Sequence, residues 1–302
     1  MRFTAYLILA ATLLLWSGNW IVARAVRDDV SPGIATWGRL AIALAVLAPF
    51  VWRGFAARLR TLSARDWCVF AAMGFFGGGP HLAMQWLGLH YTTATSATLF
   101  LSTSPVFILL LARPVLGEPI GPRQWGGVAI SFAGVATIAS GGDVKALLAL
   151  SFNVGDLLAV ASMAMWAAYT VFLRLRRDAL DVAQALFLIC AFGLAVMTPW
   201  LAWDLAGPAR VTLTPLGMLA VAYSAIGSLL LAHAGWVYVV RRLGAGRAGA
   251  TMHLMPAIAI VLAAIFLGER PSWFHFAGMA LILAGVALST LRFRGAAASS
   301  SR

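Results

Sequence analysis

The feature that most constrains the fold is a series of long apolar segments that succeed one another along the whole chain. A helix needs roughly 20 mostly apolar residues to cross a bilayer. Ten segments of this kind occur, at 4–23, 34–52, 67–89, 93–112, 124–140, 155–173, 182–203, 214–240, 247–267 and 273–291. Only 11% of the residues are charged, against about 25% in soluble domains. The pattern predicts an all-α membrane protein with ten transmembrane helices, of which the span at 214–240 is long enough to be tilted or broken.

The basic residues indicate how these spans cross the membrane. The net charge of +12 is spread one to four residues at a time between apolar segments, which is typical of topology signals and not of a nucleic-acid surface. With the N-terminus inside, sixteen Lys and Arg residues fall on the cytoplasmic side and five on the opposite side. The positive-inside rule therefore predicts that both termini are cytoplasmic. We expect a multi-pass protein of a bacterial inner membrane.

A motif recurs at an offset of 151 residues, half the chain. PVFILLLARPVLGEP at 105–119 and PAIAIVLAAIFLGERP at 256–271 both have a proline followed, twelve residues later, by Gly-Glu. The same offset pairs Gly127 with Gly278 and Gly134 with Gly285. An offset of 150 pairs Trp16 with Trp166. Each half then has five spans, and an odd number reverses the orientation of the second copy. The sequence predicts inverted five-helix repeats at 1–145 and 146–294, an arrangement typical of transporters, followed by a disordered tail at 295–302.

The region around the first copy of the motif carries a resemblance to a known family. YTTATSATLFLSTSPVFILLLARPVLGEPIGPRQWGGVAISFAGV, at 91–135, resembles the signature region of EamA-type carriers of the drug/metabolite transporter superfamily. The likeness covers nearly the whole chain, recurs at 244–271, and includes Arg39, which matches the family's usual arginine. Chain length and the Trp-rich spans 1, 3, 6 and 8 are also similar to the YddG-type exporters of aromatic amino acids. The resemblance implies a metabolite carrier.

Each copy of the repeated motif combines a proline with a charged stop. Pro105 and Pro256 lie near mid-span, where a proline kinks a helix and leaves the carbonyl one turn earlier free to face a polar cavity or a water. The kinks either adjust helix packing or act as pivots of alternating access. Gly-Glu then ends the helix. Glu118 and Glu269 are interpreted as interfacial caps or loop salt bridges, with gating as the alternative.

Polar side chains inside the spans define the candidate site, because they are costly in a membrane and point to function by default. The run GGGP at 77–80 breaks span 3 near the bilayer centre, and broken backbone at that depth lines a cavity or is buried in protein. The predicted hinge residues are Gly78, Pro80, Pro105 and Pro256. The predicted substrate-binding residues are Trp16 and Asn19 from span 1, His81 and Gln85 from span 3, Ser102 from span 4, Trp166 and Tyr169 from span 6, His233 and Trp236 from span 8, and His253 from span 9.

Each of these residues also has a simpler interpretation. Thr98 and Ser102 could hydrogen-bond their own helix one turn earlier, the tryptophans could belong to interfacial belts, and the histidines could bridge helices. The glycines at 126, 127, 134, 278 and 285 are expected to permit close packing of spans 5 and 10.

The mixture of aromatic and polar groups fits an amphipathic substrate. Indole and phenol rings offer faces for stacking, while amides and imidazoles could hold amino and carboxylate groups. We expect an exporter of small amphipathic metabolites, foremost aromatic or large apolar amino acids, that works by alternating access. Export of another metabolite or a drug is the alternative. A membrane-embedded enzyme is disfavoured because no carboxylate pair, metal-ligand cluster or nucleophile–base constellation lies at depth, and the polar midplane argues against a passive structural protein.

Partners and energy source follow from the same residues. We expect a small-molecule substrate and the lipid bilayer as partners, no cofactor, metal or nucleic acid, and a monomer or weak homodimer. The span interiors contain no Asp or Glu, and proton-driven carriers usually place titratable relays inside the membrane. His81 and His233 are the only plausible proton carriers. Transport is therefore expected not to be driven by ions.

Overall fold

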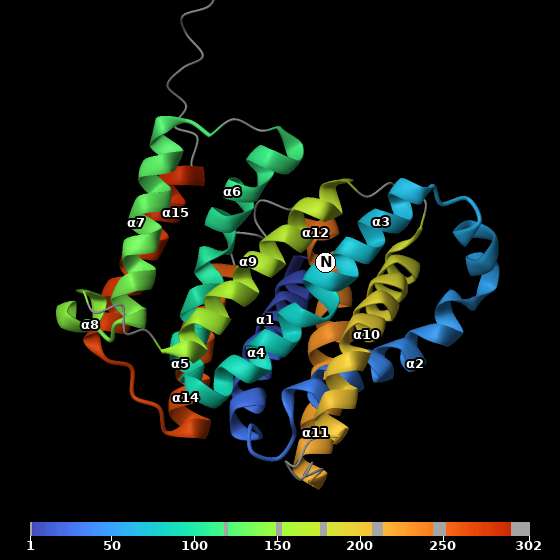
Figure 1. The fold of residues 1–302 in the computed structure, drawn as a ribbon, viewed down its shortest axis with the longest axis horizontal. Coiled ribbons are helices and arrows are strands. Elements are labelled where there is room, and N and C mark those ends of the chain that lie inside the picture. The colour runs from blue at the N-terminus through green and yellow to red at the C-terminus, as the bar shows by residue number, and fades with distance from the viewer. Residues whose placement is uncertain are drawn as a thin grey trace, which may run out of the picture.

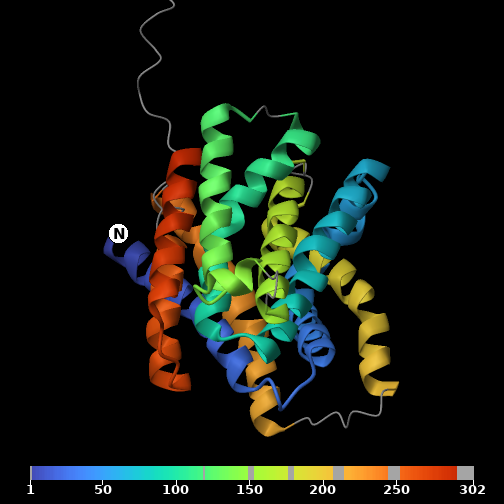
Figure 2. The ribbon, with the colours of Figure 1, turned by 60° about the vertical axis from the view of Figure 1, so that its left-hand side comes forward.

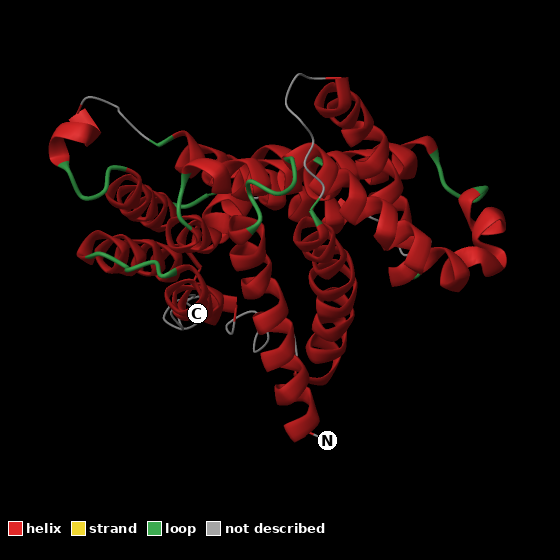
Figure 3. Ribbon diagram, turned by 90° about the horizontal axis from the view of Figure 1, so that it is seen from below, coloured by secondary structure: helices red, strands yellow, loops and turns green. Residues whose placement is uncertain are grey.

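The computed structural model describes residues 2–117, 120–148, 153–175, 180–206, 214–243 and 252–290. Within these ranges the chain forms helices and loops without a strand (Figure 3). Six helices are long and apolar enough to cross a membrane: Phe3–Ala25, Pro32–Leu59, Ala94–Leu116, Val154–Leu175, Val182–Ala206 and Pro215–Val239. Shorter apolar helices cover Met255–Leu267 and Trp273–Leu288. The chain is thus an all-α, multi-pass membrane protein, while the count of ten spans and their orientation stay predictions. Glu118 and the tail at 295–302 lie outside the described residues.

The helices of the first half follow the predicted apolar segments. They are α1 (Arg2–Ala25), α2 (Pro32–Leu59), α3 (Ala64–Met73), the π-helix η1 (Gly74–Gly78), α4 (Pro80–Tyr91), α5 (Ala94–Leu99), the 3-10 helix η2 (Phe100–Thr103), α6 (Ser104–Leu116) and α7 (Pro122–Ala139). Arg53 and Gly54 have non-helical backbone angles inside α2, with φ +73° at Gly54, a conformation that glycine adopts without steric cost. The kink falls where the predicted span ends, at residue 52.

The second half repeats this order. It contains α8 (Val144–Leu148), α9 (Val154–Leu175), α10 (Val182–Ala206), α11 (Pro215–Tyr223), the π-helix η3 (Ser224–Leu231), α12 (Ala232–Leu243), the 3-10 helix η4 (Met252–Leu254), α14 (Met255–Leu267) and α15 (Trp273–Thr290). The long span predicted at 214–240 is one helix over Pro215–Val239, and its middle part is wound as the π-helix η3. The short helix α8, near the predicted boundary between the halves, was not expected.

The helices pair mainly across the two halves of the chain. α7 packs against α15 along one edge of the molecule and α2 against α10 along the other, with α1, α4, α9 and α12 between them (Figure 1). Figure 2 shows α7 and α15 side by side over most of their length. In the centre, α1 packs on α12 and α14, and α9 packs on α4 and α6. The core of the protein therefore lies between the halves, not within each of them.

Glycines set the contact between α7 and α15. A Cβ added at Gly134 would lie 2.5 Å from the carbonyl oxygen of Gly278, and one at Gly285 would lie 2.4 Å from that of Gly127. No side chain fits at such distances, so these backbones approach closely, as small residues allow in membranes. Gly127 meets Gly285 and Gly134 meets Gly278, so the two helices run antiparallel. The expected close packing of these two spans is confirmed at these four glycines.

Candidate functional site

On one side of the bundle centre, Trp16 of α1 meets two aromatic side chains of α12. The ring centroid of Trp16 lies 5.4 Å from that of His233, edge to face, and 5.5 Å from that of Trp236. The Trp16 indole Nε1 donates a hydrogen bond to the Ser228 carbonyl at 3.1 Å, and His233 Nδ1 lies 3.4 Å from the same oxygen. The half-buried Trp16 side chain is therefore held against η3 and α12 by a hydrogen bond and two ring contacts.

Asn19 lies one turn further along α1 and contacts η3. Its side chain is buried, and its Oδ1 accepts a hydrogen bond from Ser224 Oγ at 2.6 Å. Ser228, four residues further along η3, meets Trp16 of α1 through its carbonyl and Arg39 of α2 through its hydroxyl. The sequence analysis missed these two serines, because a serine in a membrane helix usually bonds its own backbone.

On the other side of the centre, α4 and α9 form a second polar and aromatic group. His81 Nδ1 lies 2.7 Å from the Ser162 carbonyl, and Gln85 Nε2 lies 3.2 Å from His81 Nε2. A carbonyl only accepts, so Nδ1 carries the proton of the neutral ring and Gln85 donates to Nε2. The Trp166 ring lies 5.4 Å from His81 and 5.0 Å from Tyr169. The predicted site residues of spans 3 and 6 are therefore in mutual contact.

The two groups correspond to each other. Trp16 and Trp166 occupy equivalent places in the halves, and each packs at 5.4 Å against a histidine of the opposite half, His233 and His81 respectively. Each ring pair therefore connects a helix of the first half with a helix of the second. A movement of one half against the other must change both contacts.

The π-helical segments lie at equivalent positions of the two halves. Shifting Gly74–Gly78 by the repeat offset gives 225–229, which falls inside η3. π-helical turns are rare and occur often at functional sites. In the first half the helix then breaks at Gly79 (φ −111°, ψ −94°) before Pro80 starts α4, so the break predicted from GGGP is confirmed. A Cβ at Gly77 would lie 2.4 Å from the Tyr169 ring, so this close approach requires glycine.

The two repeated prolines also have equivalent surroundings. Pro105 is the second residue of α6 and follows η2, and Pro256 is the second residue of α14 and follows η4. A proline fits there because the first turn of a helix needs no donor from it. The expectation of a free carbonyl four residues before Pro105, at Leu101, was wrong, since the Ser104 N–H donates to that carbonyl in the 3-10 turn. Each proline lies where a 3-10 turn passes into an α-helix.

Two residues of span 4 do not join the two central groups. Ser102 Oγ contacts Met279 Sδ of α15 at 3.8 Å. This partner belongs neither to the two central groups nor to the helix that contains Ser102. Thr98 Oγ1 donates to the Ala94 carbonyl at 2.8 Å, as the local interpretation predicted. The side chain of His253 lies outside the described residues.

Arg39 is the residue of this region that the sequence analysis did not include in the site. It lies in the first third of α2 and is only 3% exposed. Its Nη2 is 3.5 Å from Ser228 Oγ, whereas Nε and Nη1 are buried without a hydrogen-bond partner. The guanidinium also interacts electrostatically with both His81 and His233. The signal in the sequence was a charged residue inside a predicted span. The sequence did not show which side chains of other helices would surround it.

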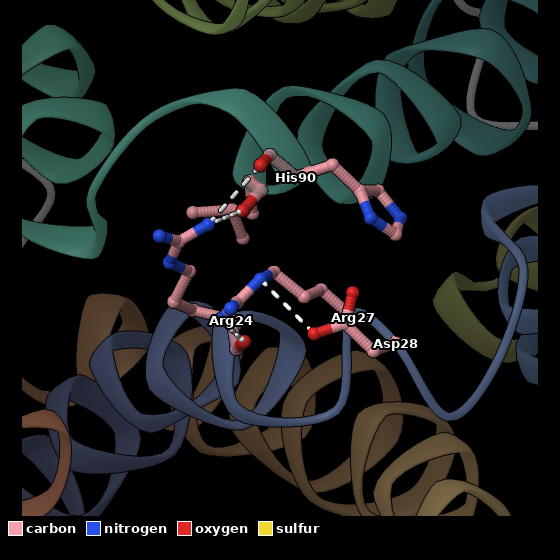
Figure 4. A network of polar contacts seen from close by, with 5 residues as sticks. Arg24, Arg27, Asp28 and His90 are labelled. Carbon is pink, nitrogen blue, oxygen red and sulfur yellow. Dashed lines mark hydrogen bonds and ion pairs between the residues drawn. The ribbon is translucent and has the colours of Figure 1, made fainter.

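Two polar contacts join helix ends on the side of the molecule where α1 and α4 end. The Arg24 guanidinium donates from Nη1 to the carbonyls of Leu89 and His90, next to an Arg27–Asp28 ion pair of 3.4 Å (Figure 4). The Arg24 guanidinium thus reaches carbonyls in the last turn of α4, which have no partner in their own helix. The contact ties the end of α1 to the end of α4.

Glu269 is the second such contact. Its carboxylate accepts from the backbone N–H groups of Ala94 and Thr95, both at 2.8 Å, and from Thr95 Oγ1 at 2.7 Å. These are the orphan donors at the start of α5, where the helix dipole favours a negative charge. The capping interpretation is confirmed for Glu269.

An apolar groove lies next to the second group. It has a volume of about 400 Å³ and lies between η1, α6 and α9. Its walls include Phe76 and Phe172, whose rings stack at 5.6 Å, together with Leu111, Val115 and Met165. The groove adds apolar surface close to Tyr169, which belongs to the same helix as Phe172.

Comparison with known proteins identifies the family. The model of the EamA-like transporter family matches residues 3–140 and again 153–291. An uncharacterised transporter of Archaeoglobus fulgidus is 30% identical over 298 residues, which are 97% of this chain and 99% of that protein. A protein of Streptantibioticus cattleyicolor named as a probable terminal-alkyne amino-acid exporter is 29% identical over 95% of this chain and 93% of its own length.

A solved structure has the same fold. It is 24% identical, covers 96% of this chain and 97% of its own, and superposes with a TM-score of 0.57. The family match extends over nearly all of the described helices, and the relatives align from end to end. The chain belongs to the EamA-like transporter family.

Proposed function

We propose that this transporter exports small amphipathic metabolites, foremost aromatic or large apolar amino acids, across a bacterial inner membrane by alternating access. The observation that carries the proposal is the pair of Trp–His contacts, Trp16 with His233 and Trp166 with His81, both at 5.4 Å. Each contact is made across the two halves of the chain. A substrate held between the two pairs would contact both halves at once. Alternating access requires this, because the site must open to one side of the membrane and then to the other as the halves move.

We further propose that the halves are inverted repeats, 1–145 and 146–294, with the substrate between them. Three observations support this division. The family model matches twice, the π-helical segments and the proline-containing pieces recur at an offset of about 151, and α7 and α15 meet antiparallel through equivalent glycines.

The chemistry of the site favours a substrate with an apolar ring and a polar end. Trp16, Trp166 and Tyr169 provide ring faces, for which offset or edge-to-face contact with another ring is favourable. Gln85, Asn19 and the two histidines provide hydrogen-bonding groups beside them. The Streptantibioticus relative, named as a probable terminal-alkyne amino-acid exporter, supports amino acids as the substrates.

The moving parts in this proposal are the places where spans are divided. Gly78 and Pro80 flank the break between η1 and α4, and Pro105 and Pro256 start α6 and α14 after a 3-10 turn. A divided helix has fewer continuous backbone hydrogen bonds, so its pieces can change their angle without unfolding a turn. These four residues are the proposed hinges.

We propose that the substrate gradient alone drives transport. The predicted span interiors hold no Asp or Glu. His81 Nδ1 and His233 Nδ1 both face backbone carbonyls, which favours a role in positioning the aromatic rings beside them over a role in carrying protons. A carrier of this kind would relieve internal accumulation of a metabolite.

The test is uptake into proteoliposomes that contain the purified protein. A panel of labelled amino acids should show saturable uptake of phenylalanine, tryptophan and leucine, with aspartate and lysine at the rate of protein-free vesicles. Uptake of none of the apolar amino acids would contradict the proposed substrate class. Saturable uptake of neutral drugs in place of amino acids would favour the alternative function, export of drugs. The apolar groove between η1, α6 and α9 would then be the candidate binding site.

A further inference from the structure

Arg39 is a buried charge whose hydrogen-bonding capacity is largely unused. Its guanidinium has five N–H donors in a planar fork. Nε and Nη1 have no acceptor, and Nη2 has only the Ser228 hydroxyl at 3.5 Å, the outer limit of a hydrogen bond. No carboxylate among the residues that the structure describes forms an ion pair with it. A buried guanidinium without an anion is strongly unfavourable, so an arginine retained for structure alone would be expected to have acceptors.

A second unpartnered polar group lies on the same face of α2. Thr36 Oγ1 is buried without a hydrogen-bond partner, and Thr36 itself is 0% exposed. Residues three apart on a helix are neighbours on its surface, so Thr36 Oγ1 and the base of the Arg39 side chain lie one turn from each other. The two groups together form a set of donors that nothing in the described part of the chain satisfies.

The groups around Arg39 supply no negative charge. His81 from α4, His233 from α12 and Cys190 from α10 interact with the guanidinium electrostatically, and Ser228 from η3 contacts it. These side chains are two imidazoles, a thiol and a hydroxyl. The surroundings of Arg39 therefore suit an anion that comes from outside the chain.

The position of Arg39 connects this anion site with the aromatic groups. Ser228, whose hydroxyl contacts the guanidinium, accepts from Trp16 Nε1 through its carbonyl, and Leu40, next to Arg39, packs in one core cluster with Leu82, next to His81. His81 and His233 are the ring partners of Trp166 and Trp16, so Arg39 lies between the two Trp–His pairs. A ligand with one anionic end and one aromatic or apolar end could reach Arg39 with the first and an indole ring with the second. A carboxylate fits best, because its two oxygens match the guanidinium fork.

We propose that Arg39, with Thr36 as a second donor, binds the carboxylate of the transported substrate, so that this transporter selects apolar carboxylates over the corresponding amides and amines. The inference rests on the proposed function and narrows its substrate class. The guanidinium, from the first half of the chain, would bind the negative end of the substrate, and Ser228 beside it belongs to the second half. Substrate binding would thus give Arg39 the acceptors that the described side chains around it do not provide.

The first test compares ligands on the wild-type protein in proteoliposomes. Uptake of labelled L-phenylalanine is measured with an excess of unlabelled L-phenylalanine, 3-phenylpropionate, phenyl phosphate, L-phenylalaninamide or phenethylamine. We expect the carboxylates to compete at least tenfold more strongly than the amide and the amine. Equal competition by L-phenylalaninamide would overturn the proposal, and stronger competition by phenyl phosphate would assign the site to phosphate and also overturn it.

The second test uses variants of α2. Arg39→Met should reduce phenylalanine uptake at least tenfold, Arg39→Lys less, because it keeps the charge without the planar fork. Thr36→Val removes only the hydroxyl and should raise the KM severalfold. Arg58→Met is the matched control, since it removes a cation from the end of the same helix, where Arg58 pairs with Asp181 at 3.4 Å, and should leave the KM unchanged. A KM unchanged in Arg39→Lys and Thr36→Val would contradict the proposal even if Arg39→Met failed to fold.

A binding measurement separates this inference from the proposed function. The melting temperature of the purified protein is measured with benzoate or with benzamide, two probes with the same ring and nearly the same size, of which only benzoate is an anion. If no amino acid is transported, the proposed function fails, but stabilisation by benzoate that is absent with benzamide and reduced in Arg39→Lys would still support the anion site. Equal stabilisation by the two probes, or none by either, would overturn it.

Discussion

Ser131 and Ile282 are hydrogen-bonded to each other although they are 151 residues apart: the Ser131 hydroxyl donates to the Ile282 carbonyl at 3.2 Å. The separation equals the offset of the repeated motif. Equivalent positions of α7 and α15 thus touch each other directly, which is the geometry expected where two inverted copies meet at an axis between them. We expect the edge of the molecule formed by α7 and α15 to stay fixed during transport, because the two backbones are in direct contact there.

This joint can be tested with a matched pair of glycines on α7. Gly134→Val would place a side chain 2.5 Å from the Gly278 carbonyl, whereas Gly126, which we expected in the same interface, has only Leu288 at 3.8 Å beside its Cβ position. We expect Gly134→Val to lower the free energy of unfolding by about 1–3 kcal/mol, as overpacking does, and Gly126→Val to change it little. Thermal unfolding in detergent measures both. Equal stability of the two variants would contradict the close packing.

The second prediction concerns the aromatic pocket. Gln85→Leu removes the donor to His81 Nε2, and Trp166→Ala removes the ring that contacts both His81 and Tyr169. Both variants should lower amino-acid uptake at least tenfold while expression and membrane insertion stay normal. Trp203→Ala is the control, because that side chain is 79% exposed at the end of α10. Wild-type rates in both pocket variants would show that the site lies elsewhere.

The proline at the start of α14 gives the third prediction. Pro256→Ala removes the ring that disfavours a helical conformation at the preceding residue, so the helix could continue through the junction of η4 and α14 and the span should become stiffer. Turnover should then fall severalfold with little change in KM. Pro199→Ala, which alters a proline inside α10, serves for comparison and should have the smaller effect on turnover. Initial rates over a range of substrate concentrations separate the two parameters. A higher KM at an unchanged maximal rate would argue for a binding role of Pro256 in place of a hinge.

The sequence predicted those features that depend on local pattern. Apolar length placed the helices, GGGP placed the break before Pro80, and the repeat offset placed the glycines of α7 and α15 in one interface. It could not predict which helices would pair, so the contact of Trp16 with His233 was not foreseen. Ser224 and Ser228 were missed because η3 contains no proline and only one glycine, so its sequence does not indicate π-helical turns. Arg39 was seen as a charge, but whether a charge is paired depends on its neighbours in space.

The fourth prediction concerns the energy source. Labelled phenylalanine should equilibrate across proteoliposomes, with no accumulation above equilibrium under an imposed pH gradient, membrane potential or sodium gradient. Accumulation that requires one of these gradients would contradict the proposal. If a pH gradient were required, two variants would locate the relay: His81→Gln, in the pocket, and Asp156→Asn, a buried carboxylate at the start of α9 that accepts from Thr92.

Counterflow in proteoliposomes tests the central claim most directly, because a single site reached from each side in turn couples the movements of its substrates. Vesicles loaded with unlabelled L-phenylalanine are diluted into a trace of labelled L-phenylalanine, without any ion gradient. An alternating-access carrier predicts a transient accumulation of label above its external concentration, which decays as the internal pool runs down and is reduced at least tenfold by Trp166→Ala. Label that only approaches the external concentration without an overshoot, in vesicles where uptake is protein-dependent, would contradict the account.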